Sequence, residues 1–282
     1  VFYLGSVPWP SGVLFSLFKS KIFLFVHGFI YHEYLAALVS GRLRARFGAL
    51  ALLSLYETGR SLGSLNFICH SQTTCNMAKV PPYKRVILPQ YFLEEDLYLY
   101  ESIRRRCAHR SNRLRIVSYS SFADSPRLLR TVHIISLAKA VRGLARRDFE
   151  FVVVDPRSEP LDLGWLKVVK PLPREEFLCL VASSDLYIER CIDEELGYGS
   201  LEAMAMGVPV AKITHHAFTK FVDYGDAVLM ADSFNKLARV VANYMDSADS
   251  LKPEHSEKAR RYVLERRMWD SVKADLIRSL YL

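Results

Sequence analysis

The sequence predicts an α/β protein built from two doubly wound domains. Three observations support this class. Short apolar runs alternate with longer amphipathic stretches along most of the 282 residues, which is the pattern of repeated strand–helix units. The apolar runs lack polar alternation, as expected for parallel strands that helices cover on both faces. A charged stretch, 100–115, interrupts the alternation, which then starts again and indicates a second domain.

The first domain, 1–105, contains four expected strands and one long expected helix. The strands are short, rich in β-branched and aromatic residues, and end near Gly, Ser or Pro. They cover residues 1–5, 21–28, 65–71 and 84–89. The expected helix covers 30–59. The charged stretch that follows is expected to be a linker or an exposed helix.

The second domain, 106–265, repeats the alternation more regularly. Its expected strands cover 115–121, 148–156, 166–172, 185–191, 208–213 and 227–231. Its expected helices cover 125–144, 173–184, 199–207 and 217–225, and the tail from 234 to 282 is expected to be almost wholly helical. In such sheets a ligand binds at the carboxyl ends of the strands.

Composition limits the class of protein. The chain is 50% hydrophobic and 24% charged, and its net charge of +8 suits anionic ligands such as nucleotides, phosphates or lipid head groups. No apolar run reaches the roughly 18 residues of a membrane span, and no signal peptide is recognised. The five cysteines show no C-x-x-C spacing, so we expect reduced thiols in a cytoplasmic protein.

One stretch, DEELGYGSLEAMAMGVPVA (193–211), points to chemistry. Glu194 and Glu202 stand eight positions apart on either side of a glycine-rich turn. The first amides of a helix lack an intrahelical acceptor and carry the positive end of the helix dipole, so they bind anions such as pyrophosphate. Gly197 and Gly199 would let the backbone approach a ligand closely and take positive φ if needed. Carboxylates that accept from vicinal hydroxyls would complete a nucleotide-sugar site.

The same pattern has a plainer structural explanation. Acids are favoured near any helix N-terminus, and short motifs often match by chance. The flanking sequence favours the functional interpretation, because the expected strand 185–191 directly precedes the turn and brings it to the carboxyl edge of a sheet.

The stretch DLYIERCIDEELGYGSLEAMAMGVPVA resembles the E-x7-E signature of retaining GT-B glycosyltransferases. The matching residues are Glu194, Leu196, Gly197, Glu202, Ala203, Met204, Ala205, Gly207, Pro209 and Val210. The likeness is strongest over 115–232 and looser before that. It implies a GT-B-like fold of two Rossmann-like domains facing a cleft, with a shortened N-terminal domain. It also implies a C-terminal helix, 266–282, that crosses back to the first domain.

The resemblance implies a role for each donor-binding residue. Glu202 would hold the ribose hydroxyls. Backbone amides of the turn would bind the diphosphate, and they belong to Leu196, Gly197, Tyr198 and Gly199.

Four further residues are candidates for the reaction centre. Glu194 would contact sugar hydroxyls, and Arg130, or else Arg127, would neutralise the leaving phosphate. His27 would lie near the transferred sugar. Each has a structural alternative, since the two arginines could form a solvated helix face and a histidine that ends a strand is often a packing residue.

The implied reaction is transfer of a sugar from a nucleotide-diphosphate sugar with retention of anomeric configuration, by front-face attack assisted by the leaving phosphate. No metal and no cofactor are expected. The sequence does not identify the acceptor, which could be a glycan, a lipid-linked molecule or a protein. We expect no nucleic-acid partner, because the run Arg104–Arg106 has no aromatic stacking platform beside it. These basic residues, with the apolar helix near 30–56, would also suit peripheral contact with an anionic membrane surface.

Two rival classes remain. The first is a catalytically silent module that binds a nucleotide or sugar. The second is an inverting GT-B epimerase or another Rossmann-type enzyme, which would not depend on both glutamates. A nicotinamide enzyme is disfavoured, because no G-x-G-x-x-G follows a strand.

Overall fold

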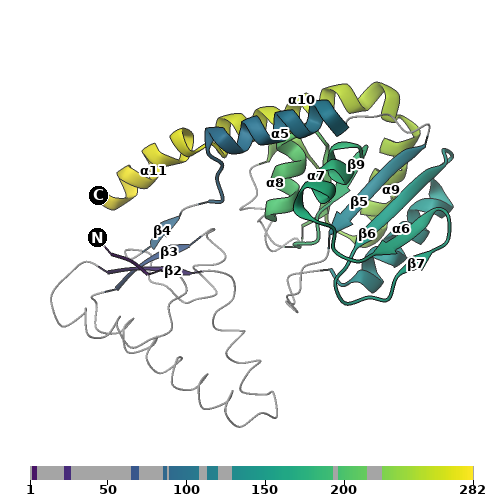
Figure 1. Ribbon diagram of the computed structural model, residues 1–282, viewed down its shortest axis with the longest axis horizontal. Helices are drawn as coiled ribbons and strands as arrows, with labels where there is room; N and C mark the ends of the chain where they lie inside the picture. The colour runs from purple at the N-terminus through teal and green to yellow at the C-terminus, as the bar shows by residue number, and fades with distance from the viewer. Residues whose placement is uncertain are drawn as a thin grey trace, which may run out of the picture. The chain divides into compact units, whose positions relative to one another are not determined.

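The computed structural model describes residues 2–4, 22–26, 65–69, 85–87, 89–107, 113–119, 129–192, 196–214 and 224–281. The chain divides into two compact units (Figure 1), which are Val1–Gln90 with Val272–Leu282, and Tyr91–Ser271. The second unit begins before the boundary expected at residue 105. The reason is that helix α5 (Glu94–Cys107), which contains part of the charged stretch, packs against other helices of this unit.

The first unit contains a parallel four-stranded sheet. Its strands pair in chain order and are β1 (Phe2–Leu4), β2 (Ile22–Val26), β3 (Leu65–Cys69) and β4 (Arg85–Ile87). All four were expected from their apolar runs. The helix expected over 30–59 lies outside the described residues.

The second unit contains a seven-stranded sheet. Its strands are β5 (Leu114–Tyr119), β6 (Phe149–Val154), β7 (Leu161–Asp162), β8 (Leu166–Val169), β9 (Leu186–Ile188), β10 (Val210–Ile213) and β11 (Val228–Ala231). They lie in the order β11-β10-β9-β5-β6-β8-β7, and every pairing is parallel except that of β7 with β8. Numbered along the chain, the six parallel strands have the doubly wound order 3-2-1-4-5-6.

Helices cover both faces of this sheet. They are α6 (Thr131–Leu144), α7 (Arg174–Ala182), α8 (Tyr198–Ala205), α9 (Phe234–Asp246) and α10 (Ala248–Arg266), and α11 (Trp269–Tyr281) follows them. The helical tail is confirmed, as three helices. Of the helix expected over 217–225, only the last two residues are described, and a short 3-10 turn, η3 (Gly225–Ala227), begins there.

Strand β6 shows why the strands read as continuous apolar runs. Phe149, Phe151 and Val153 point into a core with α6 and α9, while Val152 and Val154 point into a second core with α5, α7, α8 and α10. Each large apolar side chain buried in this way contributes about 1.5–3 kcal/mol relative to exposure. Burial on both faces confirms the prediction of a parallel sheet between two helical layers.

Helix α8 ends at a residue that only glycine suits well. Gly207 has φ 75°, the left-handed region that a side chain disfavours. Its N–H donates to Met204 O at 2.9 Å and the N–H of Val208 donates to Ala203 O at 2.8 Å. These two bonds satisfy carbonyls at the helix end and turn the chain directly into β10.

Candidate functional site

The candidate site lies where the strand order of the second sheet reverses. Strand β5 pairs with β6 on one side and with β9 on the other, so the connections leaving β5 and β9 run in opposite directions. This switch point leaves a crevice at the carboxyl ends of the strands. Helices α6 and α8 follow β5 and β9, so both helix N-termini lie at this edge, as the sequence predicted for the helix that begins near Gly199.

A buried carboxylate that the sequence analysis did not single out organises the turn before α8. Glu189 accepts hydrogen bonds from the backbone N–H groups of Arg190 at 2.6 Å, Cys191 at 2.8 Å and Gly197 at 2.5 Å. It is 5% exposed. The amide of Gly197, which we expected to bind the donor diphosphate, therefore donates to a carboxylate of the protein.

The two glycines of the turn are needed for space. Gly197 has φ −66°, and neither it nor Gly199 is among the described glycines with positive φ, so positive φ is not needed at either position. A Cβ at Gly197 would lie 3.0 Å from Glu189 Oε2, and a Cβ at Gly199 would lie 2.7 Å from the hydroxyl of Tyr187. The close approach that these glycines allow is to the protein's own side chains.

Glu202 lies in α8 and is held by two other helices. Its carboxylate is 2% exposed. Oε1 accepts from the hydroxyl of Tyr100 in α5 at 2.9 Å and from Arg174 Nη2 at the start of α7, and Oε2 accepts from Arg174 Nη1 at 2.9 Å. The two donors differ in burial, because Tyr100 is 2% exposed whereas the Arg174 side chain is 55% exposed.

Two tyrosines extend this cluster. Burial and the nearby Tyr198 raise the pKa of the Tyr100 hydroxyl, so this group stays protonated and donates to Glu202. Tyr198 is the first residue of α8 and is partly exposed. Its ring meets Phe92 edge to face, with centroids 5.2 Å apart. Burial, followed by Asp96, raises the pKa of Tyr198, so both hydroxyls are available as donors at neutral pH.

A second polar cluster lies where α6 begins. Asp155, which follows β6, accepts from the hydroxyls of Thr131 and Ser158 and from the N–H of Arg157 at 2.9 Å. Burial opposes ionisation, but these hydrogen bonds outweigh it and lower the pKa of Asp155 to about 2.

The guanidinium of Arg190 lies beside this cluster. Nε donates to Leu129 O at 2.5 Å, Nη2 also donates to Leu129 O, and the buried Nη1 has no hydrogen-bond partner. Burial lowers the pKa of Arg190, while the charge of Asp155 opposes this effect. Arg190 was not among the residues singled out from the sequence.

The structure brings five of the expected donor-binding residues together at the start of α8. They are Leu196, Gly197, Tyr198, Gly199 and Glu202. The side chain of Leu196 is buried in the core, so only its backbone could face a ligand.

The other expected residues lie at α6 or outside the described part of the chain. Arg130 is exposed immediately before α6, and its N–H donates to His133 Nδ1 at 3.2 Å. His27, Arg127 and Glu194 lie outside the described residues.

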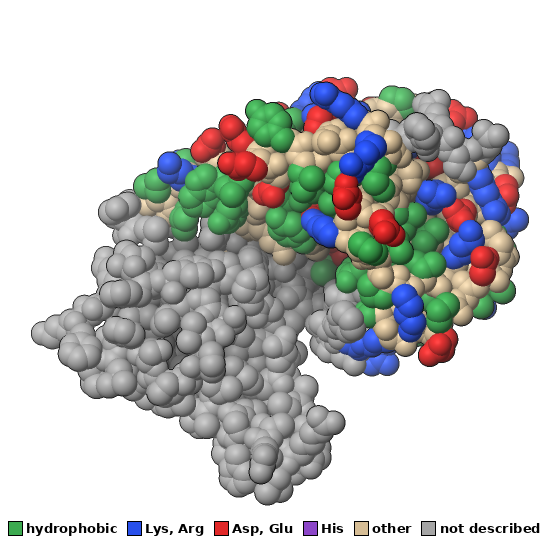
Figure 2. Space-filling model, viewed as in Figure 1, with side chains coloured by type: hydrophobic (Ala, Val, Ile, Leu, Met, Phe, Trp, Pro, Cys, Tyr) green, Lys and Arg blue, Asp and Glu red, His purple; other side chains and the backbone are tan. Residues whose placement is uncertain are grey.

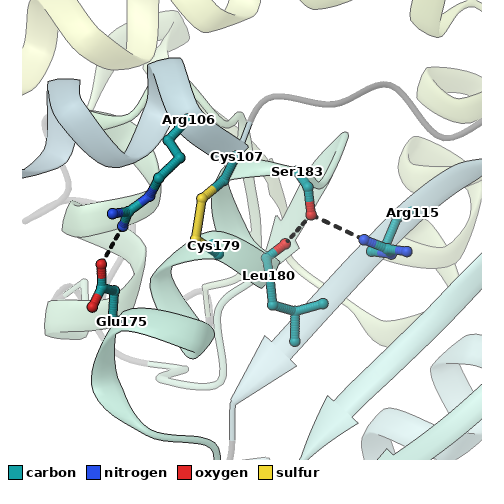
Figure 3. The surroundings of a disulfide bond; sticks show 7 residues. All are labelled: Arg106, Cys107, Arg115, Glu175, Cys179, Leu180 and Ser183. Atoms are coloured by element: carbon teal, nitrogen blue, oxygen red, sulfur yellow. Dashed lines mark hydrogen bonds and ion pairs between the residues drawn. A yellow bond between two sulfur atoms is a disulfide. The ribbon is translucent and has the colours of Figure 1, made fainter.

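The expectation of reduced thiols is wrong for three cysteines. Cys107 at the end of α5 and Cys179 in α7 form a disulfide with a Cα–Cα distance of 5.2 Å (Figure 3). Cys69 is also in a disulfide, whereas Cys191 is in none. Spacing along the chain did not reveal the pair, because packing of α5 on α7 brings the two residues together. The cysteines therefore no longer support the expectation of a cytoplasmic location.

The basic run at the end of α5 is largely matched by acids. Arg104 and Arg105 lie 3.9 Å and 3.7 Å from carboxylate oxygens of Glu101, and Arg106 pairs with Glu175. Figure 2 shows basic and acidic side chains interspersed over the visible face of the second unit. This run is therefore not a concentrated basic patch.

A cavity of about 690 Å³ at the amino edge of the second sheet is lined by Ser184, Asp185, Gly207 and Lys252, among others, and does not include the start of α8. In the described part of the chain, no three His, Cys, Asp or Glu side chains are grouped so that they could hold a metal ion. No described helix combines the length and apolar character needed to cross a membrane.

Solved structures resemble the chain over almost its whole length, although no family model and no curated protein sequence matches it. WaaG, a glycosyltransferase involved in lipopolysaccharide biosynthesis, has 16% identity and a TM-score of 0.62, covering 93% of this chain and 76% of its own. Sucrose-phosphate synthase from Thermosynechococcus elongatus has 16% identity and a TM-score of 0.63, covering 96% and 71%. Alr3699/HepE of Anabaena, in complex with UDP-glucose, has 13% identity and a TM-score of 0.64, covering 96% and 74%. These likenesses confirm the expected GT-B-like α/β fold.

Proposed function

We propose that the protein is a glycosyltransferase whose donor is a nucleotide-diphosphate sugar. The observation that carries this proposal is the position of Glu202. It lies in α8, next to the switch point of a 3-2-1-4-5-6 parallel sheet, in a fold similar to that of WaaG and of HepE with UDP-glucose. Ligands of doubly wound sheets bind at this point.

In the proposed complex Glu202 accepts hydrogen bonds from the two ribose hydroxyls. An ionised carboxylate can accept from both members of a vicinal diol, and charge assistance strengthens each bond. Burial of Glu202 supports this role, because a desolvated carboxylate binds a hydroxyl more strongly than one in water.

The diphosphate would lie between the N-termini of α6 and α8. Since Glu189 occupies the amide of Gly197, the proposed donors from α8 are the amides of Tyr198 and Gly199. Arg130 before α6 would supply a positive charge. These groups would stabilise the negative charge that grows on the leaving nucleoside diphosphate, which is the main electrostatic demand of the reaction.

The remaining roles rest on the sequence resemblance. Glu194 would contact hydroxyls of the transferred sugar, Arg127 is the alternative to Arg130 at the leaving phosphate, and His27 would lie near the transferred sugar. Transfer would retain the anomeric configuration and need no metal, with the leaving phosphate assisting front-face attack.

A second candidate is a silent nucleotide-binding module, and two observations favour it. Glu202 is already engaged by Arg174 and Tyr100, and the amide of Gly197 is engaged by Glu189. If these contacts were permanent, donor binding would be weak and turnover absent.

The test combines binding with product analysis. A thermal-shift screen against UDP-, GDP- and ADP-sugars identifies the donor, because a ligand that binds only the folded state raises the melting temperature. The selected donor is then incubated with the protein and a panel of glycan, lipid-linked and peptide acceptors. A glycosylated product with the donor's anomeric configuration supports the proposal. Binding without transfer or donor hydrolysis supports the silent module, and no stabilisation by any donor contradicts both.

A further inference from the structure

The hydrogen-bonding capacity of Glu202 is almost filled by the protein itself. A carboxylate offers about four acceptor positions. Tyr100 and Arg174 use both positions of Oε1, and Arg174 Nη1 uses one position of Oε2. One acceptor position is left. A vicinal diol donates two hydrogen bonds, so it cannot bind while both contacts of Arg174 persist.

Arg174 is the partner that can leave. Glu202 and Tyr100 are each 2% exposed, whereas the Arg174 side chain is 55% exposed. Water can therefore solvate a displaced guanidinium, whereas the buried Tyr100 hydroxyl has no access to water and would lose its bond to a charged carboxylate, which is costly. Of the three groups, only Arg174 has a low-cost alternative position.

The helix that carries Arg174 is fixed, so the change is confined to its side chain. The disulfide between Cys107 and Cys179 and the ion pair between Arg106 and Glu175 both join α5 to α7, as Figure 3 shows. Helix α7 also begins directly after Pro173, whose ring fixes its backbone φ.

We propose that Arg174 is a positioning residue that gates the nucleoside subsite. It holds Glu202 in place when the site is empty and must release the carboxylate when a ribose diol binds. This inference rests on the proposed function, since it assumes that Glu202 receives the ribose. Only a ligand with a vicinal diol bears the free-energy cost of displacing Arg174 from Glu202. A 2′-deoxyribose, with its single 3′-hydroxyl, can use the one remaining acceptor position without moving Arg174.

The difference between ribose and 2′-deoxyribose gives a test. The phosphates contribute equally to the binding of both nucleotides, so their contribution cancels when the two affinities are compared. The measured quantity is the ratio of the affinity for UDP to the affinity for 2′-deoxy-UDP, obtained by calorimetry. Arg174→Ala removes the competitor for the diol, so the ratio should rise by roughly 3- to 10-fold, the size expected for the net contribution of one ordinary hydrogen bond. Most of the change should be tighter binding of UDP.

Two further variants serve as controls for this test. Arg174→Lys keeps the charge but loses the two-pronged contact, so the ratio should rise less, and this variant carries the test if Arg174→Ala does not fold. Arg142→Ala removes another partly exposed arginine, which lies in the last turn of α6 and pairs with Asp148, and should leave the ratio unchanged.

The outcomes separate the two proposals. If the wild type binds UDP but the ratio is unchanged or lower in the Arg174 variants, Arg174 is not a gate, and the proposed function stands. If the wild type binds no UDP-, GDP- or ADP-containing nucleotide, both the proposed function and the gate are overturned.

Discussion

Two buried carboxylates near α8 look alike in exposure but differ in their partners. Glu189, before the helix, is held by three backbone amides. Glu202, inside the helix, is held by two side chains, one of which is more than half exposed. Backbone amides of a formed turn cannot leave without unfolding the turn, whereas an exposed guanidinium can.

This difference separates structural from exchangeable acids. Burial alone would rank both residues as equal candidates for ligand binding. The identity of the partner indicates that Glu189 shapes the turn and that Glu202 can receive a ligand. The predictions below begin with this distinction, continue with the neighbouring Asp155 and Gly199, and run from the largest expected effect to the smallest.

Replacing Glu189 should mainly damage stability. Glu189→Ala leaves one buried and two part-buried amides without their acceptor, so the free energy of unfolding should fall by about 3 kcal/mol. Urea denaturation measures the loss. Glu189→Gln keeps one acceptor oxygen and should lose less. A loss below about 1 kcal/mol for the alanine variant would show that water replaces the carboxylate and that the turn does not depend on it.

Replacing Glu202 should mainly damage binding. Glu202→Gln keeps the shape but removes the charge, and nucleotide binding should weaken by roughly 1–3 kcal/mol through loss of charge-assisted hydrogen bonds. Calorimetric titration with UDP gives the change. Equal nucleotide affinities in the Gln variants at 189 and 202 would remove the distinction between the two acids.

Asp155 should give the protein an acid-sensitive component of stability. Its pKa is lowered from 3.8 to about 2 in the folded state. A lowered folded pKa stabilises the protein at pH values above the unfolded pKa, and this contribution disappears as the pH falls toward the folded pKa. The contribution is about 2 kcal/mol, and it should be lost between about pH 4 and pH 2.

Comparison with Asp155→Asn tests this window. The variant should be less stable than the wild type at neutral pH, and the difference should shrink as the pH falls through that range. Chemical denaturation at a series of pH values measures it. A difference that stays constant down to pH ~2 would mean that the ionised carboxylate is not the stabilising group.

The glycine at 199 should show the smallest effect. Alanine normally stabilises a helix relative to glycine by about 0.5–1 kcal/mol. A Cβ at Gly199, however, would lie 2.7 Å from the Tyr187 hydroxyl, so Gly199→Ala should destabilise by about 1 kcal/mol.

Two controls isolate the clash. Adding Tyr187→Phe should relieve part of the loss, because it removes the hydroxyl. Gly143→Ala, at a helical position with open space around it, should be neutral or stabilising. Thermal unfolding compares the three variants, and a stabilising Gly199→Ala would show that the tyrosine moves aside freely.

Much of the fold could be predicted from local sequence. Strand β6, for example, reads as a continuous apolar run because both of its faces are buried. The start of α8 could be placed at the carboxyl edge because it follows a buried strand. The short antiparallel strand β7, with two exposed residues, carries no comparable pattern and was missed.

The partners of the site could not be predicted, because they are distant in sequence. Tyr100 lies 102 residues from Glu202, and Arg174 lies 28 residues away. Cys107 and Cys179 are 72 residues apart. Only the packing of α5, α7 and α8 brings these groups together. The pattern of apolar residues along the sequence does not show which side chains of different helices will be in contact. Glu189 was missed for a different reason. The expected strand 185–191 included it, whereas β9 ends at Ile188.

The most direct test is the position of a bound ribose. In a crystal structure of the protein with UDP, the two ribose hydroxyls should lie roughly 2.5–3.0 Å from the carboxylate oxygens of Glu202, with the phosphates between the starts of α6 and α8. A ribose turned away from Glu202, or a nucleotide bound elsewhere on the molecule, would contradict the account.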